Sequence, residues 1–113
     1  MKLIIAIIQP HKLDAVKTEL EAVGVNLMTV SNVLGQGRQK GLTEIYRGAK
    51  EAGGLLNKVR LDIAVNDDFV EPAIKAINKG AHTGDVGDGK IFILELAECV
   101  RISSAERGHT AIG

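Results

Sequence analysis

Two glycine-rich segments that carry basic residues are the parts of this 113-residue chain with the clearest capacity for chemistry. Residues 83–90 read TGDVGDGK, and residues 35–41 read GQGRQKG. Because glycine has no Cβ, backbone N–H groups in such segments can approach an anion closely, and nearby Lys or Arg side chains add positive charge. Each segment alone is also explained without a ligand, the first as a tight turn and the second as a solvated loop. Both together leave phosphate binding and plain loops about equally favoured.

Neither segment matches a standard nucleotide-binding motif. Residues 35–41 lack the helix that follows a dinucleotide fingerprint, and they lack the spacing and the Ser or Thr of a P-loop. In the other segment Lys90 could reach a phosphate, and Arg101 lies at the far end of the strand expected next.

A catalytic or metal-binding site has less support. The three histidines are scattered without metal-ligand spacing, and Cys99 has no partner for a disulfide or for a CxxC site. The adjacent acids Asp67 and Asp68 are explained as caps of a helix. The sequence therefore predicts a binding protein and not an enzyme.

These segments need elements to position them, and hydrophobic periodicity predicts the order strand, helix, strand, long loop, strand, helix, strand. Strands are expected at residues 2–9, 25–34, 59–65 and 91–100. Apolar residues at steps of three and four predict helices from Leu13 to Val23 and from Val70 to Ile77, ended by Gly24 and Gly80. Between the second and third strands, residues 35–57 have no period and hold six glycines.

This order predicts one α+β domain over residues 1–113 with a ferredoxin-like fold, in which two βαβ units form a four-stranded antiparallel sheet. Both helices then cover one face of that sheet. The first strand nevertheless carries apolar residues in both phases, for example Ile4 and Ile5. Because the second face also needs a cover, we expect a homo-oligomer.

Composition narrows the class of partner. Fourteen basic and fourteen acidic residues cancel, so no overall field draws the chain to nucleic acid, and only three residues are aromatic. The apolar run at the start of the chain is too short to span a bilayer and lacks a signal-peptide cleavage site. A cytoplasmic location is expected.

Two long motifs resemble those of the PII nitrogen-signalling proteins. Residues 37–49, GRQKGLTEIYRGA, are similar to the T-loop of that family, and residues 83–92, TGDVGDGKIF, are similar to its B-loop. The opening AIIQPHKLDAV and the stretch NKVRLD at 57–62 also resemble the family. The likeness covers nearly the whole chain, with a T-loop at 35–57, a B-loop at 81–90 and a C-terminal segment at 102–113.

The resemblance implies a homotrimer with ATP or ADP in each cleft between subunits. The residues that match positions around the nucleotide are Gly35, Gly37, Arg38, Gly87, Asp88, Gly89, Lys90 and Arg101. Among these, Arg38, Lys90 and Arg101 would lie near the phosphates. The positions that match the adenosine side are Ile7, Thr29, Asp62 and Ala64.

The resemblance also implies an effector and partners. Gln39 would coordinate an Mg²⁺ ion that bridges ATP and 2-oxoglutarate, and Lys58 would pair with a 2-oxoglutarate carboxylate. Tyr46, Arg47 and Gly48 lie in the part of the T-loop that contacts partners, and Arg47 matches the residue that can enter an ammonium-channel pore. Ordering of this loop would convert ligand state into control of a membrane transporter or a nitrogen-metabolism enzyme, with recruitment to the inner membrane face.

The chain departs from the family pattern at several positions. Glu51 replaces the tyrosine that is often uridylylated, and Ala49 replaces a serine that some members phosphorylate. Ser103 stands in place of a phosphate-side arginine, Asp62 in place of a longer glutamate, and Asp85 in place of a basic residue. These changes put covalent control and the ATP, ADP or AMP preference in question.

Two alternative functions remain open on the sequence. The first is a PII-like sensor of adenine nucleotides and another small anion, which controls a different transporter or enzyme without 2-oxoglutarate sensing or uridylylation. The second is a metal-tolerance or scaffold trimer of similar architecture, which would bind transition metals and no nucleotide.

Overall fold

The four strands of the computed structural model form one antiparallel sheet in the order β2-β3-β1-β4. The structure describes residues 1–37 and 54–113. The strands are β1 (Lys2–Ile8), β2 (Thr29–Gly35), β3 (Leu56–Val65) and β4 (Gly89–Glu95). This topology confirms the expected α+β, ferredoxin-like fold.

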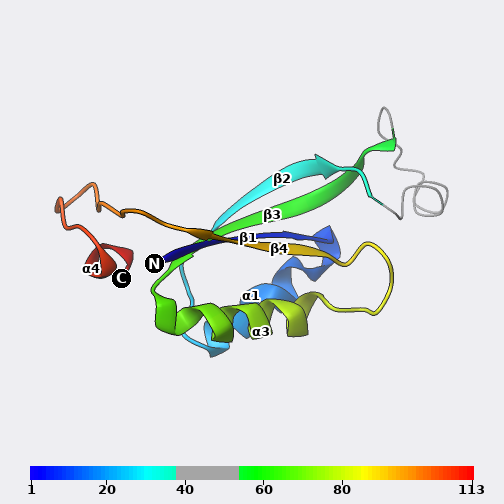
Figure 1. Cartoon of the computed structure of the whole chain (residues 1–113). Helices are drawn as coiled ribbons and strands as arrows, with labels where there is room; N and C mark the ends of the chain where they lie inside the picture. The colour runs from blue at the N-terminus through cyan, green and yellow to red at the C-terminus, as the bar shows by residue number, and fades with distance from the viewer. Residues whose placement is uncertain (38–53) are drawn as a thin grey trace.

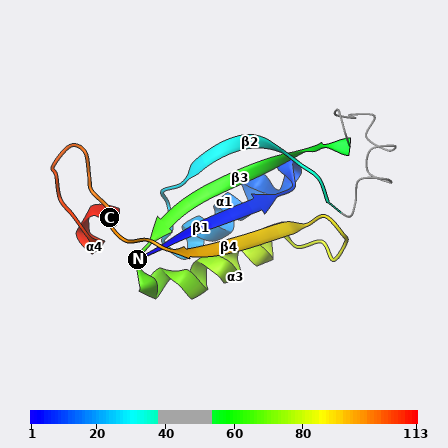
Figure 2. The ribbon, with the colours of Figure 1, turned by 45° about the horizontal axis from the view of Figure 1, so that its top comes forward.

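The two long helices lie side by side beneath one face of the sheet (Figure 1). They are α1 (Leu13–Ala22) and α3 (Val70–Ala81), preceded by the short 3₁₀ turns η1 (Pro10–Lys12) and η3 (Asp67–Phe69). A one-turn helix, α4 (His109–Ile112), ends the chain. Figure 2 looks toward the opposite face of the sheet, which no helix of the described residues covers. No helix in the described ranges has the length and hydropathy needed to cross a bilayer.

Strand alternation builds the core. In β1 the buried side chains are Ile4, Ala6 and Ile8, and they face the helices together with the alternate residues of β3. Residues of the other phase point to the uncovered face, where Phe92 and Leu94 of β4 are 49% and 44% exposed. The expected apolar second face is therefore present, while the oligomer that would cover it stays a prediction.

The prediction that Asp67 and Asp68 cap a helix is wrong, since neither η3 nor α3 has a side-chain cap. Asp67 instead accepts hydrogen bonds from the amino-terminal ammonium of Met1 at 2.9 Å and from Lys2 Nζ at 3.2 Å. The bond from the ammonium, followed by the one from Lys2, lowers the pKa of the Asp67 carboxyl. Asp67 therefore bonds to Met1 and Lys2, which are distant in sequence, and not to the backbone at the helix end.

Gly80 lies inside α3 and does not end the helix as expected. A Cβ at this position would lie 2.7 Å from Val16 Cα of α1, so a hydrogen atom here allows the two helix backbones to meet. Several strand limits also differ from expectation, and β3 begins already at Leu56 and β4 at Gly89. β2 begins only at Thr29, and β4 ends at Glu95 because its partner β1 begins at Lys2, which pairs with Glu95.

The contact at Gly80 gives a prediction for stability. Gly→Ala inside a helix normally stabilises, yet Gly80→Ala should lower the free energy of unfolding by roughly 1–3 kcal/mol, because the backbone of α1 must move. Urea unfolding followed by circular dichroism at fixed protein concentration measures this. The exposed Lys75→Ala of the same helix is the control and should leave the midpoint unchanged. A Gly80→Ala protein as stable as the wild type would contradict the proposed contact.

Candidate anion-binding site

One end of the sheet holds a cavity of about 540 Å³. It lies where β2 ends, where β3 and β4 begin, and where the loop that follows α3 returns to the sheet. Its lining residues are Ile7, Gly35, Gln36, Gly37, Lys58, Val86, Gly87, Gly89, Lys90 and Phe92. Seven of these belong to the predicted site, so the structure brings together both glycine-rich segments that the sequence singled out.

Lys58 lies at the inner wall of the cavity and is only 8% exposed. Its Nζ donates a hydrogen bond to the carbonyl oxygen of Gly87 at 3.2 Å. Burial of an ammonium group is unfavourable unless hydrogen-bond acceptors or anions compensate it. This side chain therefore links β3 to the 82–88 loop and also offers positive charge to the cavity.

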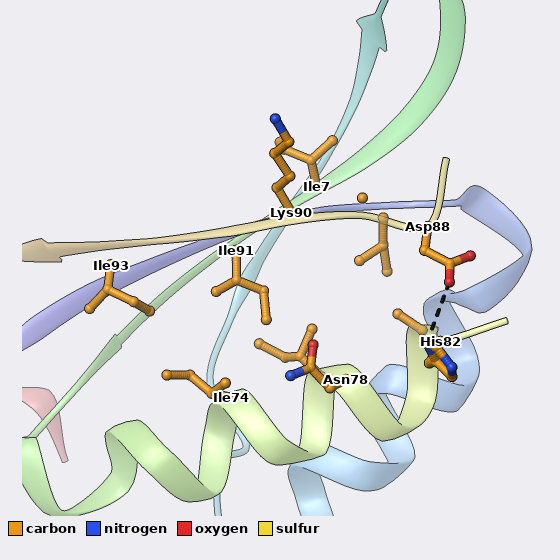
Figure 3. Close-up of a pocket in the computed structure, with 12 residues that line it drawn as sticks. Ile7, Ile74, Asn78, His82, Asp88, Lys90, Ile91 and Ile93 are labelled. Atoms are coloured by element: carbon orange, nitrogen blue, oxygen red, sulfur yellow. Dashed lines mark ion pairs between the residues drawn. The ribbon is translucent and has the colours of Figure 1, made fainter. Parts of the chain in front are cut away.

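Asp88 holds the 82–88 loop together. Its carboxylate accepts hydrogen bonds from the backbone N–H groups of Thr83 at 2.7 Å and Gly84 at 3.0 Å, and from the Thr83 hydroxyl. His82 Nδ1 lies 3.6 Å from the same carboxylate. Figure 3 marks this ion pair with a dashed line. The Asp88 side chain thus shapes the loop, and a direct contact with a ligand stays a prediction.

The pKa of Asp88 reflects these bonds. Partial burial favours the neutral acid, but the hydrogen bonds from Thr83 and Gly84 outweigh it and lower the pKa. A carboxyl whose pKa is lower in the folded state stabilises that state above the ordinary Asp pKa of about 3.9, and this contribution is lost as pH falls through the lowered value. The Asp88 carboxylate therefore stabilises the loop at neutral pH, and this contribution is lost in acid.

Gly89 allows the loop to enter β4 at this point. Its φ of +114° is one that other residues rarely adopt, and a Cβ there would lie 1.8 Å from the carbonyl oxygen of Ile7. Lys90 follows at once. Figure 3 shows that Lys90 and Ile7 point away from α3, to the opposite side of the sheet from Ile91 and Ile93.

A second hollow, of about 410 Å³, lies between β4 and α3 and is drawn in Figure 3. Its walls are mainly isoleucines, among them Ile74 of α3 and Ile93 of β4. His82 and Asp88 lie at one end, so this hollow and the 540 Å³ cavity, called the anion cavity below, are both bordered by the 82–88 loop.

The lining of the anion cavity suits a polyanion. It offers two lysine ammonium groups together with glycine backbone, and no acidic side chain lines it among the described residues. A Cβ at Gly37 would meet nothing within 4 Å, so there is open space beside this backbone. The described ranges contain no group of three or more metal-ligating side chains. The donors present fit a phosphate chain, which lysines and amide N–H groups bind well.

Four predicted site residues lie elsewhere. Thr29 pairs with Asp62 in the β2–β3 ladder, and Ala64 lies two residues further along β3. Lys58 and Ala64 are separated by six residues of a strand, or about 20 Å. Asp62 accepts a hydrogen bond from Arg60 Nη2 at 2.9 Å. Arg101 follows β4 and contacts the C-terminal segment. Ala64 lines a hollow together with Ile112 of α4, and Arg101 is bonded to the same helix. These four residues are called the second cluster below.

Five predicted positions lie outside the described residues. They are Arg38, Gln39, Tyr46, Arg47 and Gly48. Three lining residues were not predicted, namely Gln36, Val86 and Phe92. Two of them had a signal in the sequence. Phe92 lies two positions after Lys90 and so shares its face of the strand, and Val86 is the one apolar side chain within the 83–90 segment.

Comparisons with known proteins give one consistent result. The family model "Nitrogen regulatory protein P-II" matches residues 1–106. The chain is 51% identical over 114 residues to nitrogen regulatory protein GlnK1 of Methanosarcina mazei, which covers 99% of this chain and 97% of the relative. It is 51% identical over 112 residues to nitrogen regulatory protein P-II of Azospirillum brasilense, covering 99% and 100%. Nitrogen regulatory protein GlnK of Escherichia coli is 44% identical over 112 residues, with the same coverage.

The bonds to Asp88 predict how a substitution would change the loop. In Asp88→Ala the amides of Thr83 and Gly84 lose a charged acceptor, which is worth about 1.5–3 kcal/mol, so their hydrogen exchange should speed up by about tenfold or more. Residue-resolved exchange measures the rates. Asp85→Ala is the matched control, because the Asp85 carboxylate has no bonding partner within the described part of the chain. Equal exchange rates in the wild type and Asp88→Ala would show that Asp88 does not hold the loop.

Proposed function

This chain belongs to the nitrogen regulatory protein P-II family, and on that premise we propose that it is a nucleotide-gated regulator that acts as a homotrimer. Family membership confirms the resemblance stated from the two motifs. It also confirms the expectation of a nitrogen-regulation signalling protein and not an enzyme. Proteins of this family bind adenine nucleotides. The finer proposal is that ATP and ADP occupy clefts between neighbouring subunits.

One observation carries the proposal: the predicted nucleotide residues form two clusters along β3, in which Asp62 lies four residues, or about 13 Å, and Ala64 six residues, or about 20 Å, from Lys58. Cations and glycines gather in the cavity at Lys58 and Lys90, while Thr29, Asp62 and Ala64 lie toward the other end. In a single copy the second cluster does not line the cavity at Lys58 and Lys90. A head-to-tail arrangement brings the cavity of one copy against the second cluster of the next.

The uncovered sheet face supports the same arrangement. Phe92 and Leu94 are large, apolar and nearly half exposed, and an apolar face of this kind usually packs against another surface. Head-to-tail contacts close into a ring when the rotation between copies permits it. A ring of three copies, as the resemblance implies, would hold three equivalent clefts.

Within each cleft we assign the phosphates to the cavity. The charge of the phosphates would be balanced by Lys90 and Arg38 of the same copy and by Arg101 of the neighbouring copy. The adenosine would contact Ile7 of the first copy and Thr29, Asp62 and Ala64 of the neighbour. Backbone groups of the two glycine segments, at Gly35 and Gly37 and at Gly87 and Gly89, would line the phosphate path. Mg²⁺, held through Gln39, would bridge ATP and 2-oxoglutarate, and Lys58 would meet a carboxylate of the latter.

The output would pass through the T-loop at 35–57, whereas the B-loop at 81–90 and the C-terminal segment at 102–113 would hold the nucleotide. Tyr46, Arg47 and Gly48 would contact the regulated protein, for which an ammonium-channel type transporter or a nitrogen-metabolism enzyme is proposed. The protein would act in the cytoplasm and be recruited to the inner membrane face by such a transporter.

Calorimetry tests the ligands. ATP and ADP should each bind the wild type with micromolar affinity or better, and 2-oxoglutarate with Mg²⁺ should tighten ATP more than ADP, because the two anions share the metal ion. No binding of ATP, ADP or AMP at high micromolar concentration would reject the nucleotide role. Nucleotide binding that 2-oxoglutarate does not change would favour the alternative sensor of another small anion.

Subunit mixing tests the shared cleft. Lys90→Ala and Arg101→Ala should each lose ADP binding, since each removes a charge partner of phosphate, whereas the exposed Lys17→Ala should not. Co-refolding the two defective variants in equal amounts should restore binding in about a quarter of the clefts, because a cleft between different chains can carry both wild-type residues. Absence of recovery would place both side chains in one chain's site. A stable monomer would remove the clefts altogether.

A further inference from the structure

Arg101 is held by residues of its own chain in this structure. Its Nη2 donates hydrogen bonds to the carbonyl oxygens of Thr110 at 3.3 Å and Ala111 at 3.2 Å, both in α4. Its Nε lies 3.4 Å from Glu106 Oε1. The guanidinium group therefore already has a carboxylate and two carbonyls as partners, which are the types of acceptor that a phosphate would replace.

Glu106 is positioned for this contact by a small local network. Its carboxylate Oε1 accepts a hydrogen bond from the Ser104 hydroxyl at 2.9 Å, and its backbone N–H donates to the same hydroxyl at 3.2 Å. Its carbonyl oxygen accepts a bond from the backbone N–H of Arg101 at 2.9 Å. The Ser104 hydroxyl and the backbone bond between Arg101 and Glu106 therefore hold the Glu106 carboxylate beside the guanidinium group.

The helix that supplies the two carbonyls is itself docked. Ala111 of α4 is 8% exposed, and the carbonyl oxygen of His109 accepts a hydrogen bond from Asn66 Nδ2 at 3.1 Å. Ile112 lines a hollow together with Ala64, a residue of the second cluster. Figure 2 places this segment at the opposite end of the sheet from the loop that precedes β4. Arg101 is therefore stored away from the phosphate cavity of its own copy.

We infer that Glu106 sets the nucleotide affinity by competing, within the chain, with the nucleotide phosphate for Arg101. This inference rests on the proposed function, because it assumes that Arg101 serves a phosphate in a neighbouring cleft. Glu106 and α4 occupy Nε and Nη2 of the guanidinium. A phosphate that binds two neighbouring N–H groups must use at least one of these nitrogens, so it displaces Glu106 or the carbonyls of α4. The apparent Kd for the nucleotide then equals the intrinsic Kd divided by the fraction of Arg101 that is not held at Glu106.

The exposure of the pair makes it displaceable. The side chains of Arg101 and Glu106 are 42% and 49% exposed, so water screens the attraction between them and a multiply charged phosphate can win the exchange. A buried pair would instead be a fixed part of the fold. The same screening limits the expected gain on removing Glu106 to about two- to fivefold in affinity.

Titration of ADP into the full-length trimer by calorimetry tests the inference. Glu106→Gln keeps the shape of the side chain but removes its charge, and it should lower the ADP Kd by about two- to fivefold. Glu98→Gln is a matched control in the same segment, because Glu98 is 44% exposed and pairs with Arg107, not with Arg101. Its ADP Kd should equal that of the wild type. Ser104→Ala, which only frees the Glu106 carboxylate, should shift the Kd in the same direction by less.

An unchanged or higher Kd in Glu106→Gln, or an equal gain in Glu98→Gln, would overturn the inference while leaving the proposed function in place. A wild type that binds no ADP would overturn the proposed function itself.

Discussion

The pairing of β1 with β3 on one side and β4 on the other is the constraint on which the rest of the structure depends. In this register Ile7 lies opposite both Arg60 and Lys90, and Ile8 lies opposite Gly89. The close approach of Gly89 to the Ile7 carbonyl leaves no room for a side chain, so the preceding loop can enter the sheet only here. A shift of one residue would turn Lys90 toward the helices and away from the cavity.

Much of the fold follows from period and order in the sequence, because strands and helices bury alternate or every third and fourth residue. The element order, the antiparallel sheet and the one-sided helices were all predictable in this way. The errors came where a distant residue competed with a local rule. Asp67 bonds to the amino terminus and Lys2, and Gly80 serves a helix crossing instead of a helix end. No pattern within a short window contains that information.

The site was less predictable than the fold. The glycine segments favoured an anion site and plain loops about equally, and the resemblance to a family supplied the individual roles. The hydrogen bonds of Lys58 with Gly87 and of Asp88 with Thr83 exist only once the 82–88 loop has folded back onto the sheet. Similarly, Glu106 carries no motif, and its place beside Arg101 appears only once the C-terminal segment folds back. Charge pairs of this type are decided by tertiary structure, which composition does not encode.

The enclosure of Lys58 has a consequence for covalent chemistry at the site. A lysine amine reacts with an acylating reagent only when it is unprotonated and the reagent can reach it from solvent. Lys58 is 8% exposed, whereas Lys90 at the same cavity is open to solvent. The two lysines should therefore differ widely in labelling rate, although they line one cavity. A slow reagent would modify Lys90 selectively and leave Lys58 intact. Chemical labelling of this cavity would therefore report on its solvent-exposed rim and not on the buried part near Lys58.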